Sequence, residues 1–217
     1  MSDLKLYDYW RSSASYRLRI ALNLKGVSYE SVPVNIIPGT DEQLGDAYRA
    51  INPQMRVPAI EVGHRIASQS MAILEWLDET WPDPAILPSE PWKKLQVRSF
   101  ADVIACDIHP LNNLSVLAKL REQFGAEKDA VADWYREWIL RGFTALEAVA
   151  ANAGTSTTYL FTDEPTLAEI CLVPQLSNAR RFDTPLAEFP RLVEVDAKCR
   201  ELDAFARAAP EAVKPAD

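Results

Sequence analysis

The sequence has few of the residues that mark disulfide-rich, metal-binding or disordered proteins. Its three cysteines, Cys106, Cys171 and Cys199, form no Cys-x-x-Cys pair, which argues against a disulfide framework and indicates reduced thiols. Its two histidines, His64 and His109, belong to no His or Cys cluster, so we expect no metal site. Only 7 of the 217 residues are glycine and no tract is of low complexity, so a folded chain is expected.

Positive charge is also in deficit. Lys and Arg number 23 against 31 Asp and Glu, which gives a formal net charge of −8. This balance argues against binding nucleic acid through a broad basic face, although an anionic small molecule could bind a local group of arginines. The apolar runs are short and interrupted by charges, so we expect no membrane association. Residues 1–6 lack the pattern of a signal peptide, and with the reduced thiols this favours a cytoplasmic location.

The predicted strands and helices divide the chain into two parts. Residues 4–9 read as a strand, residues 15–25 as a buried helix that Gly26 ends, and residues 32–36 as a second strand. A short surface helix over 41–50, two strands over 59–62 and 65–67, and a helix over 70–79 follow. The order β-α-β-α-β-β-α predicts an α/β domain over residues 1–80.

The second part is helical. Four prolines in residues 80–91 predict a stiff linker over 81–91. Helices are then expected over 92–119, bent at Pro110, over 130–151 and over 192–208. Thr166 and Glu169 have the spacing of a capping box, which predicts a helix that begins there. The predicted fold class is therefore α/β plus all-α, with an all-helical domain over 92–217.

Three local features can carry chemistry. Residues 11–17 lie between a strand and a helix, where free amides and hydroxyls stabilise an anion or a thiolate. Val57-Pro58 comes just before a strand and can form a cis turn that exposes backbone. Gln69-Ser70 opens a helix and can receive a carboxylate. Taken singly, serine capping better explains the first feature and an ordinary strand-entry proline the second, while capping and ligand binding explain the third equally well.

Together, in this order, these features resemble the cytosolic glutathione transferases. That resemblance implies a thioredoxin-like domain followed by the helical domain of that family. The segment Arg11-Ser12-Ser13-x-Ser15-x-Arg17-x-Arg19-Ile20-Ala21-Leu22 resembles the zeta-class signature. The similarity extends over nearly the whole chain through Asn52-Pro53, Val57-Pro58, Gln69-Ser70, Pro110-Leu111-x-Asn113-Leu114-Ser115-Val116-Leu117, Thr166-Leu167-Ala168, Leu172-Val173-Pro174-Gln175 and Asn178-Ala179-x-Arg181-Phe182.

The zeta class includes maleylacetoacetate isomerase and maleylpyruvate isomerases, so the resemblance implies an enzyme with glutathione as cofactor. Reversible addition of a thiolate turns the C=C bond of a cis diacid into a single bond that can rotate, and elimination then gives the trans acid. The first expectation is conversion of maleylacetoacetate to fumarylacetoacetate. Leu114-Ser115 resembles the maleylacetoacetate branch, because some maleylpyruvate isomerases have arginine at this place. The alternatives are maleylpyruvate isomerisation, conjugation or dehalogenation of α-haloacids, and a catalytically silent glutathione-binding protein. The resemblance also implies a homodimer.

The resemblance assigns roles to residues of the first part. Ser12 is the expected thiolate stabiliser and Ser13 the second choice, with Arg11 beside them. Further residues expected at glutathione are Ala14, Ser15, Tyr16 and Arg17 through their amides, Gln43, Val57 with Pro58, Gln69 and Ser70. Ala14 stands where zeta enzymes commonly have cysteine. This argues against a reaction that uses a protein thiol in addition to the thiol of glutathione.

In the helical part, the resemblance places His109, Asn113, Leu114 and Ser115 near glutathione. Arg11 and Arg181 are expected to bind the substrate carboxylates, because charge-assisted hydrogen bonds from arginine suit an anionic diacid. Arg180 and His64 receive no role.

Overall fold

The structure is a computed structural model that describes residues 4–153 and 156–215. They fall into two compact units. The first comprises the residues up to Ile86 together with those from Glu201 onward, and the second is Leu87–Arg200. The sequence predicted that the helical domain would extend to residue 217. The structure differs here, because the stretch after Glu201 packs with the first unit.

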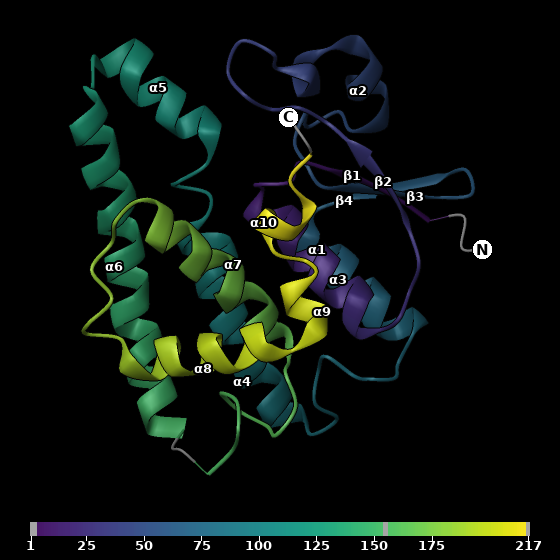
Figure 1. Cartoon of the computed structure of the whole chain (residues 1–217), viewed down its shortest axis with the longest axis vertical. Helices are drawn as coiled ribbons and strands as arrows, with labels where there is room; N and C mark the ends of the chain where they lie inside the picture. The colour runs from purple at the N-terminus through teal and green to yellow at the C-terminus, as the bar shows by residue number, and fades with distance from the viewer. Residues whose placement is uncertain (1–3, 154–155, 216–217) are drawn as a thin grey trace. The chain divides into compact units, whose positions relative to one another are not determined.

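The first unit contains a four-stranded mixed sheet (Figure 1). Its strands are β1 (Leu4–Asp8), β2 (Glu30–Pro33), β3 (Ala59–Val62) and β4 (Arg65–Ser68), in the order β2-β1-β3-β4. β1 is parallel to β2 and antiparallel to β3, and β3 is antiparallel to β4. The predicted α/β part is confirmed, although β2 begins and ends earlier than the alternation over 32–36 indicated.

Alternation along β1 decides which helices cover which face of the sheet. Asp8 shares the buried face with Leu4 and Leu6, and it binds Arg19 of α1 (Ser13–Leu24). α3 (Ser70–Thr80) lies beside α1. Tyr7 points to the opposite face, where its ring meets Tyr48 of α2 (Asp46–Ile51) edge-on at 6.1 Å. The surface helix expected over 41–50 is thus a 3-10 turn, η1 (Glu42–Leu44), followed by α2.

Buried Arg19 joins the stretch after Glu201 to the first unit. Its Nη1 contacts the Asp8 carboxylate at 2.7 Å, and its Nη2 donates to the Trp10 carbonyl at 2.9 Å. Its Nε donates to the Ala208 carbonyl at 2.9 Å, near the helices α9 (Asp203–Ala206) and α10 (Pro210–Val213). A buried guanidinium needs such partners, so these residues complete the first unit.

The second unit consists of helices. They are α4 (Pro91–Asp102), the π-helical segment η2 (Val103–Ile108), α5 (Leu114–Phe124), α6 (Lys128–Ala153), α7 (Leu167–Arg181) and α8 (Pro190–Glu201), whose last residue falls in the first unit. The prediction of one bent helix over 92–119 was wrong, since η2 and a break at residues 109–113 divide it. The helix predicted over 192–208 likewise ends at Glu201, and α9 is separate.

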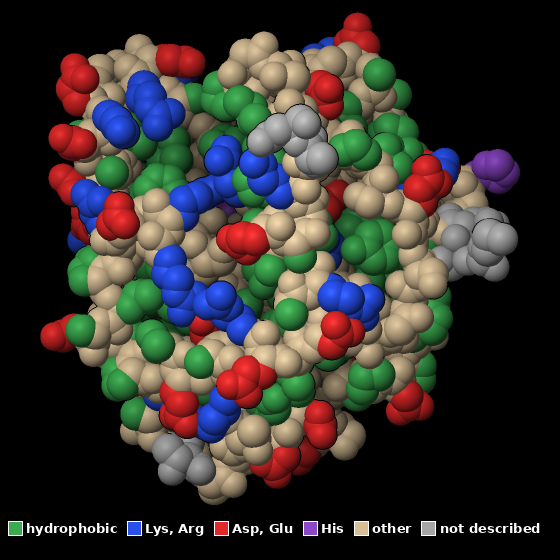
Figure 2. All heavy atoms as spheres, viewed as in Figure 1, with side chains coloured by type: hydrophobic (Ala, Val, Ile, Leu, Met, Phe, Trp, Pro, Cys, Tyr) green, Lys and Arg blue, Asp and Glu red, His purple; other side chains and the backbone are tan. Residues whose placement is uncertain are grey.

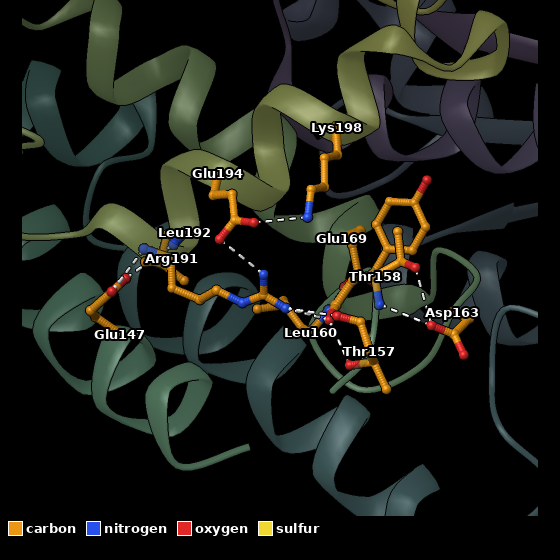
Figure 3. A network of polar contacts seen from close by, with 11 residues as sticks. Glu147, Thr157, Thr158, Leu160, Asp163, Glu169, Arg191, Leu192, Glu194 and Lys198 are labelled. Carbon is orange, nitrogen blue, oxygen red and sulfur yellow. Dashed lines mark hydrogen bonds and ion pairs between the residues drawn. The ribbon is translucent and has the colours of Figure 1, made fainter. Parts of the chain in front are cut away.

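Polar contacts fix the helix ends in the second unit (Figure 3). The predicted capping box is confirmed: the amide of Thr166 donates to the carboxylate of buried Glu169 at 2.7 Å, and the amide of Leu160 donates to it at 2.8 Å. Glu147 of α6 accepts from the first amides of α8. Because buried amides need acceptors, these carboxylates define where α7 and α8 begin.

The surface carries charges of both signs. Figure 2 shows acidic and basic side chains interspersed over the face in view. The described helices include none that is both long and apolar enough to cross a membrane. Within residues 4–153 and 156–215, no cluster of three or more His, Cys, Asp or Glu side chains is arranged to hold a metal ion.

Candidate active site

The strand register of the first unit brings three predicted segments to one edge of the sheet. Ala59 of β3 pairs with both Tyr7 of β1 and Ser68 of β4. The chain therefore leaves β1 toward Ser12, enters β3 from Val57-Pro58, and leaves β4 toward Gln69, all at this edge. Both α1 and α3 begin here, so the positive ends of two helix dipoles share one edge with the predicted glutathione-binding residues.

Ser12 is the N-cap of α1. Its backbone is extended, with φ −71° and ψ 120°, and its Oγ accepts a hydrogen bond from the Ser15 amide at 3.3 Å. A hydroxyl has one proton to donate and two lone pairs, so capping leaves the Ser12 proton available for a further acceptor. Ser12 is half-buried, whereas Ser13 is buried. The more accessible hydroxyl at the helix start is therefore that of Ser12.

The amides of α1 are only partly available. The Ser15 amide is bound to Ser12 Oγ, and the Tyr16 amide donates to the Ser12 carbonyl at 2.9 Å as the first bond of the helix. The expectation that all the amides of residues 14–17 face an anion is therefore too broad, because the cap occupies that of Ser15, the first helical bond occupies that of Tyr16, and Arg17 lies further inside the helix. The side chain of Ser15 is fully buried, and the Tyr16 hydroxyl contacts the Phe205 carbonyl at 3.5 Å. Both side chains serve the packing of the first unit.

The start of α3 is joined to α1 by a buried arginine. Arg17 is 1% exposed, and its Nη1 donates to Ser70 Oγ at 3.2 Å. Gln69 has φ 75°, an uncommon value for a residue with a side chain, and its Nε2 donates to Gln54 at 2.7 Å. The sequence assigned only the amide of Arg17 to the site. Its guanidinium adds a buried positive charge beside Ser70, which suits a carboxylate.

The remaining predicted residues of the first unit lie in loops. Val57-Pro58 is a cis peptide, and Pro58 is buried. The preceding loop is braced at the Arg56 carbonyl, which accepts from Tyr48 at 2.8 Å and from Asn52 at 2.7 Å. Gln43 donates to Asp41 at 3.2 Å, while its buried Oε1 has no hydrogen-bond partner among the described residues. That oxygen can accept from a ligand amide or amine.

Four predicted residues of the second unit lie in the loop that follows η2 and in the first residues of α5. His109 is half-buried and directly follows η2. Asn113 is the N-cap of α5, and its Oδ1 accepts from the Ser115 amide at 3.1 Å and from the Ser115 hydroxyl at 2.9 Å. Leu114 is 46% exposed. Asn113 and Ser115 thus bind each other at the helix start.

Arg11 and Arg181 are both exposed, each in its own unit. The Arg11 guanidinium lies 5.3 Å from the centre of the Trp10 ring. Arg181 lies 5.0 Å from the ring of Phe182 and hydrogen-bonds to buried Tyr135. Burial raises the pKa of Tyr135, although Arg181 acts against that rise, so this phenol keeps its proton. Sequence reasoning missed Tyr135, which holds Arg181 through its hydroxyl.

Arg180, adjacent to Arg181, has a different function. It contacts the carboxylate of Asp196 at 2.5 Å, and Asp196 is completely buried. Arg180 therefore neutralises a buried charge of α8. This explains why neighbouring arginines at the end of α7 need not share a role.

The residues of the first unit fit glutathione on their own chemistry. A tripeptide with two carboxylates, an amine and a thiol needs anion-binding helix starts, a hydroxyl donor and free acceptors. Ser70 beside Arg17 can bind an anion, the Ser12 hydroxyl can donate a hydrogen bond, and the Gln43 oxygen can accept one.

Comparison with known proteins agrees with this chemistry. Residues 2–79 match the glutathione S-transferase N-terminal domain. The chain is 50% identical to a maleylpyruvate isomerase of Ralstonia sp. over 96% of this chain and 98% of the relative. It is 44% identical to a maleylacetoacetate isomerase of Pseudomonas aeruginosa over 95% and 96% of the two chains.

Solved structures give the same result. The holo structure of a bacterial maleylpyruvate isomerase, described as a zeta-class glutathione S-transferase, is similar with a TM-score of 0.95 and 49% identity, covering 98% of this chain and 100% of that one. A maleylacetoacetate isomerase from Methylobacterium extorquens AM1, crystallised with malonate and glutathione, is similar with a TM-score of 0.93 and 35% identity, over 98% and 100% of the chains. The chain belongs to the glutathione S-transferase family, in its zeta class. It is an enzyme with the thioredoxin-like and helical architecture that the sequence predicted.

Proposed function

We propose that the protein is a glutathione-dependent cis–trans isomerase of a maleyl-type diacid, with maleylacetoacetate as first substrate and fumarylacetoacetate as product. The supporting observation is the sheet edge of the first unit, where two helix starts, the Ser12 hydroxyl and the buried Arg17 guanidinium gather. The isomerase from Methylobacterium extorquens AM1 was crystallised with glutathione and with malonate, a small diacid.

The residues have separate tasks in this reaction. When bound, glutathione supplies the thiolate that adds reversibly to the C=C bond. The Ser12 hydroxyl donates a hydrogen bond to the sulfur and favours the ionised form, because a hydrogen bond to the charged state lowers a thiol pKa. Ser70 and Gln69 hold the γ-glutamyl carboxylate, with Arg17 behind Ser70. The backbone of Val57 pairs with the cysteinyl part.

Substrate binding in this proposal involves an arginine from each unit. Arg181, held by Tyr135, binds a substrate carboxylate, and Arg11 does so from the first unit. Charge-assisted hydrogen bonds also stabilise the enolate that forms as the double bond is lost. His109, Asn113, Leu114 and Ser115 of the second unit are proposed to contact glutathione.

Maleylpyruvate is the second candidate substrate. The 50% identity to the Ralstonia enzyme, against 44% to the Pseudomonas aeruginosa maleylacetoacetate isomerase, favours it. Leu114-Ser115 favours maleylacetoacetate instead. The two acids share the cis diacid chemistry, so the residues that act on the double bond are the same for both.

We further propose that the enzyme is a cytoplasmic homodimer. None of its three cysteines forms a disulfide bond, in keeping with a reducing compartment. Light scattering at micromolar concentration should give twice the chain mass of 24.3 kDa, and a monomer mass would contradict the dimer.

The deciding experiment is an isomerase assay with each acid, with and without glutathione. We expect turnover that requires glutathione but leaves its total amount unchanged, and the higher kcat/KM identifies the preferred acid. Stoichiometric loss of glutathione with α-haloacids would instead mark a conjugating or dehalogenating transferase. Glutathione binding without turnover of any of these acids would refute the proposal.

A further inference from the structure

The segment that carries His109 begins with an irregular helical turn. The amide of His109 donates to the Ile104 carbonyl at 3.0 Å, five residues earlier, as in a π-helix. Such a turn contains one residue more than an α-helical turn, so it rotates every side chain that follows. π-helical turns of this kind are frequent at functional sites. The direction in which His109 leaves η2 therefore depends on what stabilises this turn.

Gly142 of α6 is the contact point for the turn. A Cβ atom at Gly142 would lie 2.5 Å from Cγ1 of Ile108, closer still to its Cδ1, and 3.8 Å from Cγ1 of Val103. Ile108 is 1% exposed. Glycine usually weakens a helix interior by about 1 kcal/mol relative to alanine, so its presence here needs a compensating contact. The side chain of Ile108 fills the space that a Cβ would take.

Ile108 has little freedom to move aside. It is branched at Cβ, which restricts χ1, and it is buried. Since Cγ1 lies one bond beyond Cβ, relieving a contact there requires a new χ1 rotamer or a shift of backbone. In a closely packed interior the backbone of η2 has to yield.

Two hydrogen bonds, one donated by α6 and one accepted by it, hold the chain just after His109. Trp134 Nε1 donates to the Leu111 carbonyl at 2.9 Å. Asn112, which is 6% exposed, donates through Nδ2 to the Tyr135 carbonyl at 3.0 Å. Ile108 before His109 and residues 111–112 after it are therefore both fixed to α6, and a shift at Gly142 has to be absorbed around His109.

We propose that Gly142 is a positioning residue: by leaving room for Ile108, it sets the π-helical turn and with it the orientation of His109. The inference rests on the proposed function only in taking His109 to face glutathione. Gly142 touches no reacting atom in this account and acts through Ile108.

The test compares Gly142→Ala with the double variant Gly142→Ala/Ile108→Ala, which removes Cγ1 and Cδ1. Ile108→Ala alone measures the effect of the cavity that the shortened side chain leaves. Thr144→Ala is the matched control, because Thr144 is an exposed residue of the same helix. Imidazole NMR signals are the first readout, since the chain has only two histidines and His64 lies in the hairpin between β3 and β4. Glutathione affinity by calorimetry is the second.

We expect Gly142→Ala to shift the His109 signals and leave those of His64 in place. Glutathione affinity should fall by roughly 2- to 30-fold, the range for residues that act through a packed neighbour. The double variant should restore both values toward those of Ile108→Ala, and Thr144→Ala should change neither. If Gly142→Ala does not fold, recovery of folding and of the His109 signals in the double variant supports the contact.

Unchanged His109 signals in folded Gly142→Ala would overturn the inference, because Ile108 would then have rotated without moving the turn. Loss of thermal stability with unchanged glutathione affinity and unchanged signals would do the same. The NMR readout needs no glutathione. A wild-type protein that binds none would therefore refute the proposed function and leave the positioning test intact.

Discussion

Replacing Ser12 separates its two possible roles, because alanine and glycine affect a helix N-cap differently. Ser12→Ala loses the cap, worth about 0.5–1 kcal/mol here since the bond to the Ser15 amide is long at 3.3 Å. Ser12→Gly costs only about a few tenths of a kcal/mol as a cap. Both variants remove the hydroxyl proton. Stability should therefore distinguish the two variants, whereas catalysis should not.

The catalytic loss follows from the charge on the sulfur. A hydrogen bond to a charged group contributes about 1.5–3 kcal/mol, so both variants should lose roughly 10- to 150-fold in kcat/KM. Removing the donor should raise the thiol pKa by about 1–2 units, so activity should continue to rise at a pH where the wild type has levelled off. Glutathione affinity measured at low pH, where the thiol is protonated, should change little.

The assays are initial isomerisation rates from pH 5 to 9, calorimetry with glutathione, and urea unfolding. Ser13→Ala serves as the neighbouring control and should keep its rate within about threefold of the wild type, because buried Ser13 is the less accessible hydroxyl. Ser12→Gly with wild-type turnover and an unshifted pH profile would refute the reasoning. The helix dipole or Ser13 would then have to stabilise the thiolate.

Three further predictions concern charged side chains. Arg11→Met and Arg181→Met should each raise KM for the diacid by about 10- to 150-fold and affect conjugation of an uncharged electrophile much less; equal losses on both substrates would contradict a role at substrate. Burial raises the pKa of Asp196 against the effect of Arg180, so stability due to this carboxyl is present below its unfolded pKa and is lost as the pH rises through its folded pKa. Arg180→Met removes the positive charge that lowers the pKa of Asp196, so the pKa rises further. Urea unfolding should show that this variant loses about 2 kcal/mol of unfolding free energy at pH 8 and less at pH 4. An equal loss at both pH values would show that the ion pair does not matter. Glu169→Ala removes the acceptor of the buried Leu160 and Thr166 amides, so it should lower the unfolding free energy by about 2–5 kcal/mol. A loss below about 1 kcal/mol would contradict this.

The elements that sequence reasoning placed well are those with a local cause. β3 and β4 flank the turn at Gly63-His64, α1 and α3 follow helical periodicity, and the capping box marks the start of α7. The predicted helix over 92–119 failed because contacts with another helix hold the interrupted segment: Ile108 packs at Gly142 of α6, and Asn112 donates to the Tyr135 carbonyl of α6. The residue pattern within one segment cannot predict a contact with a residue of another helix.

The candidate site shows the same division. Ser12 at a helix start and Gln69-Ser70 at another are visible as local patterns, and the structure places them at one edge of the sheet. The direction of the Arg17 side chain could not be predicted, because in a helix rich in buried residues its partner Ser70 is 53 positions away. Tyr135 was missed for the same reason, since nothing near it in sequence points to Arg181.

The bond between Arg19 and the Ala208 carbonyl spans 189 positions, and this has a consequence for how the chain is made. At about 5–20 residues per second, the ribosome delivers Ala208 roughly 10–40 seconds after Arg19. During that interval α1, which carries Ser12 at its start, has a buried arginine short of one acceptor. The helical unit, whose residues end at Arg200, is complete before the unit that begins the chain. A nonsense mutation shortly after residue 200 should therefore spare the helical unit and damage the end of the protein that was synthesised first.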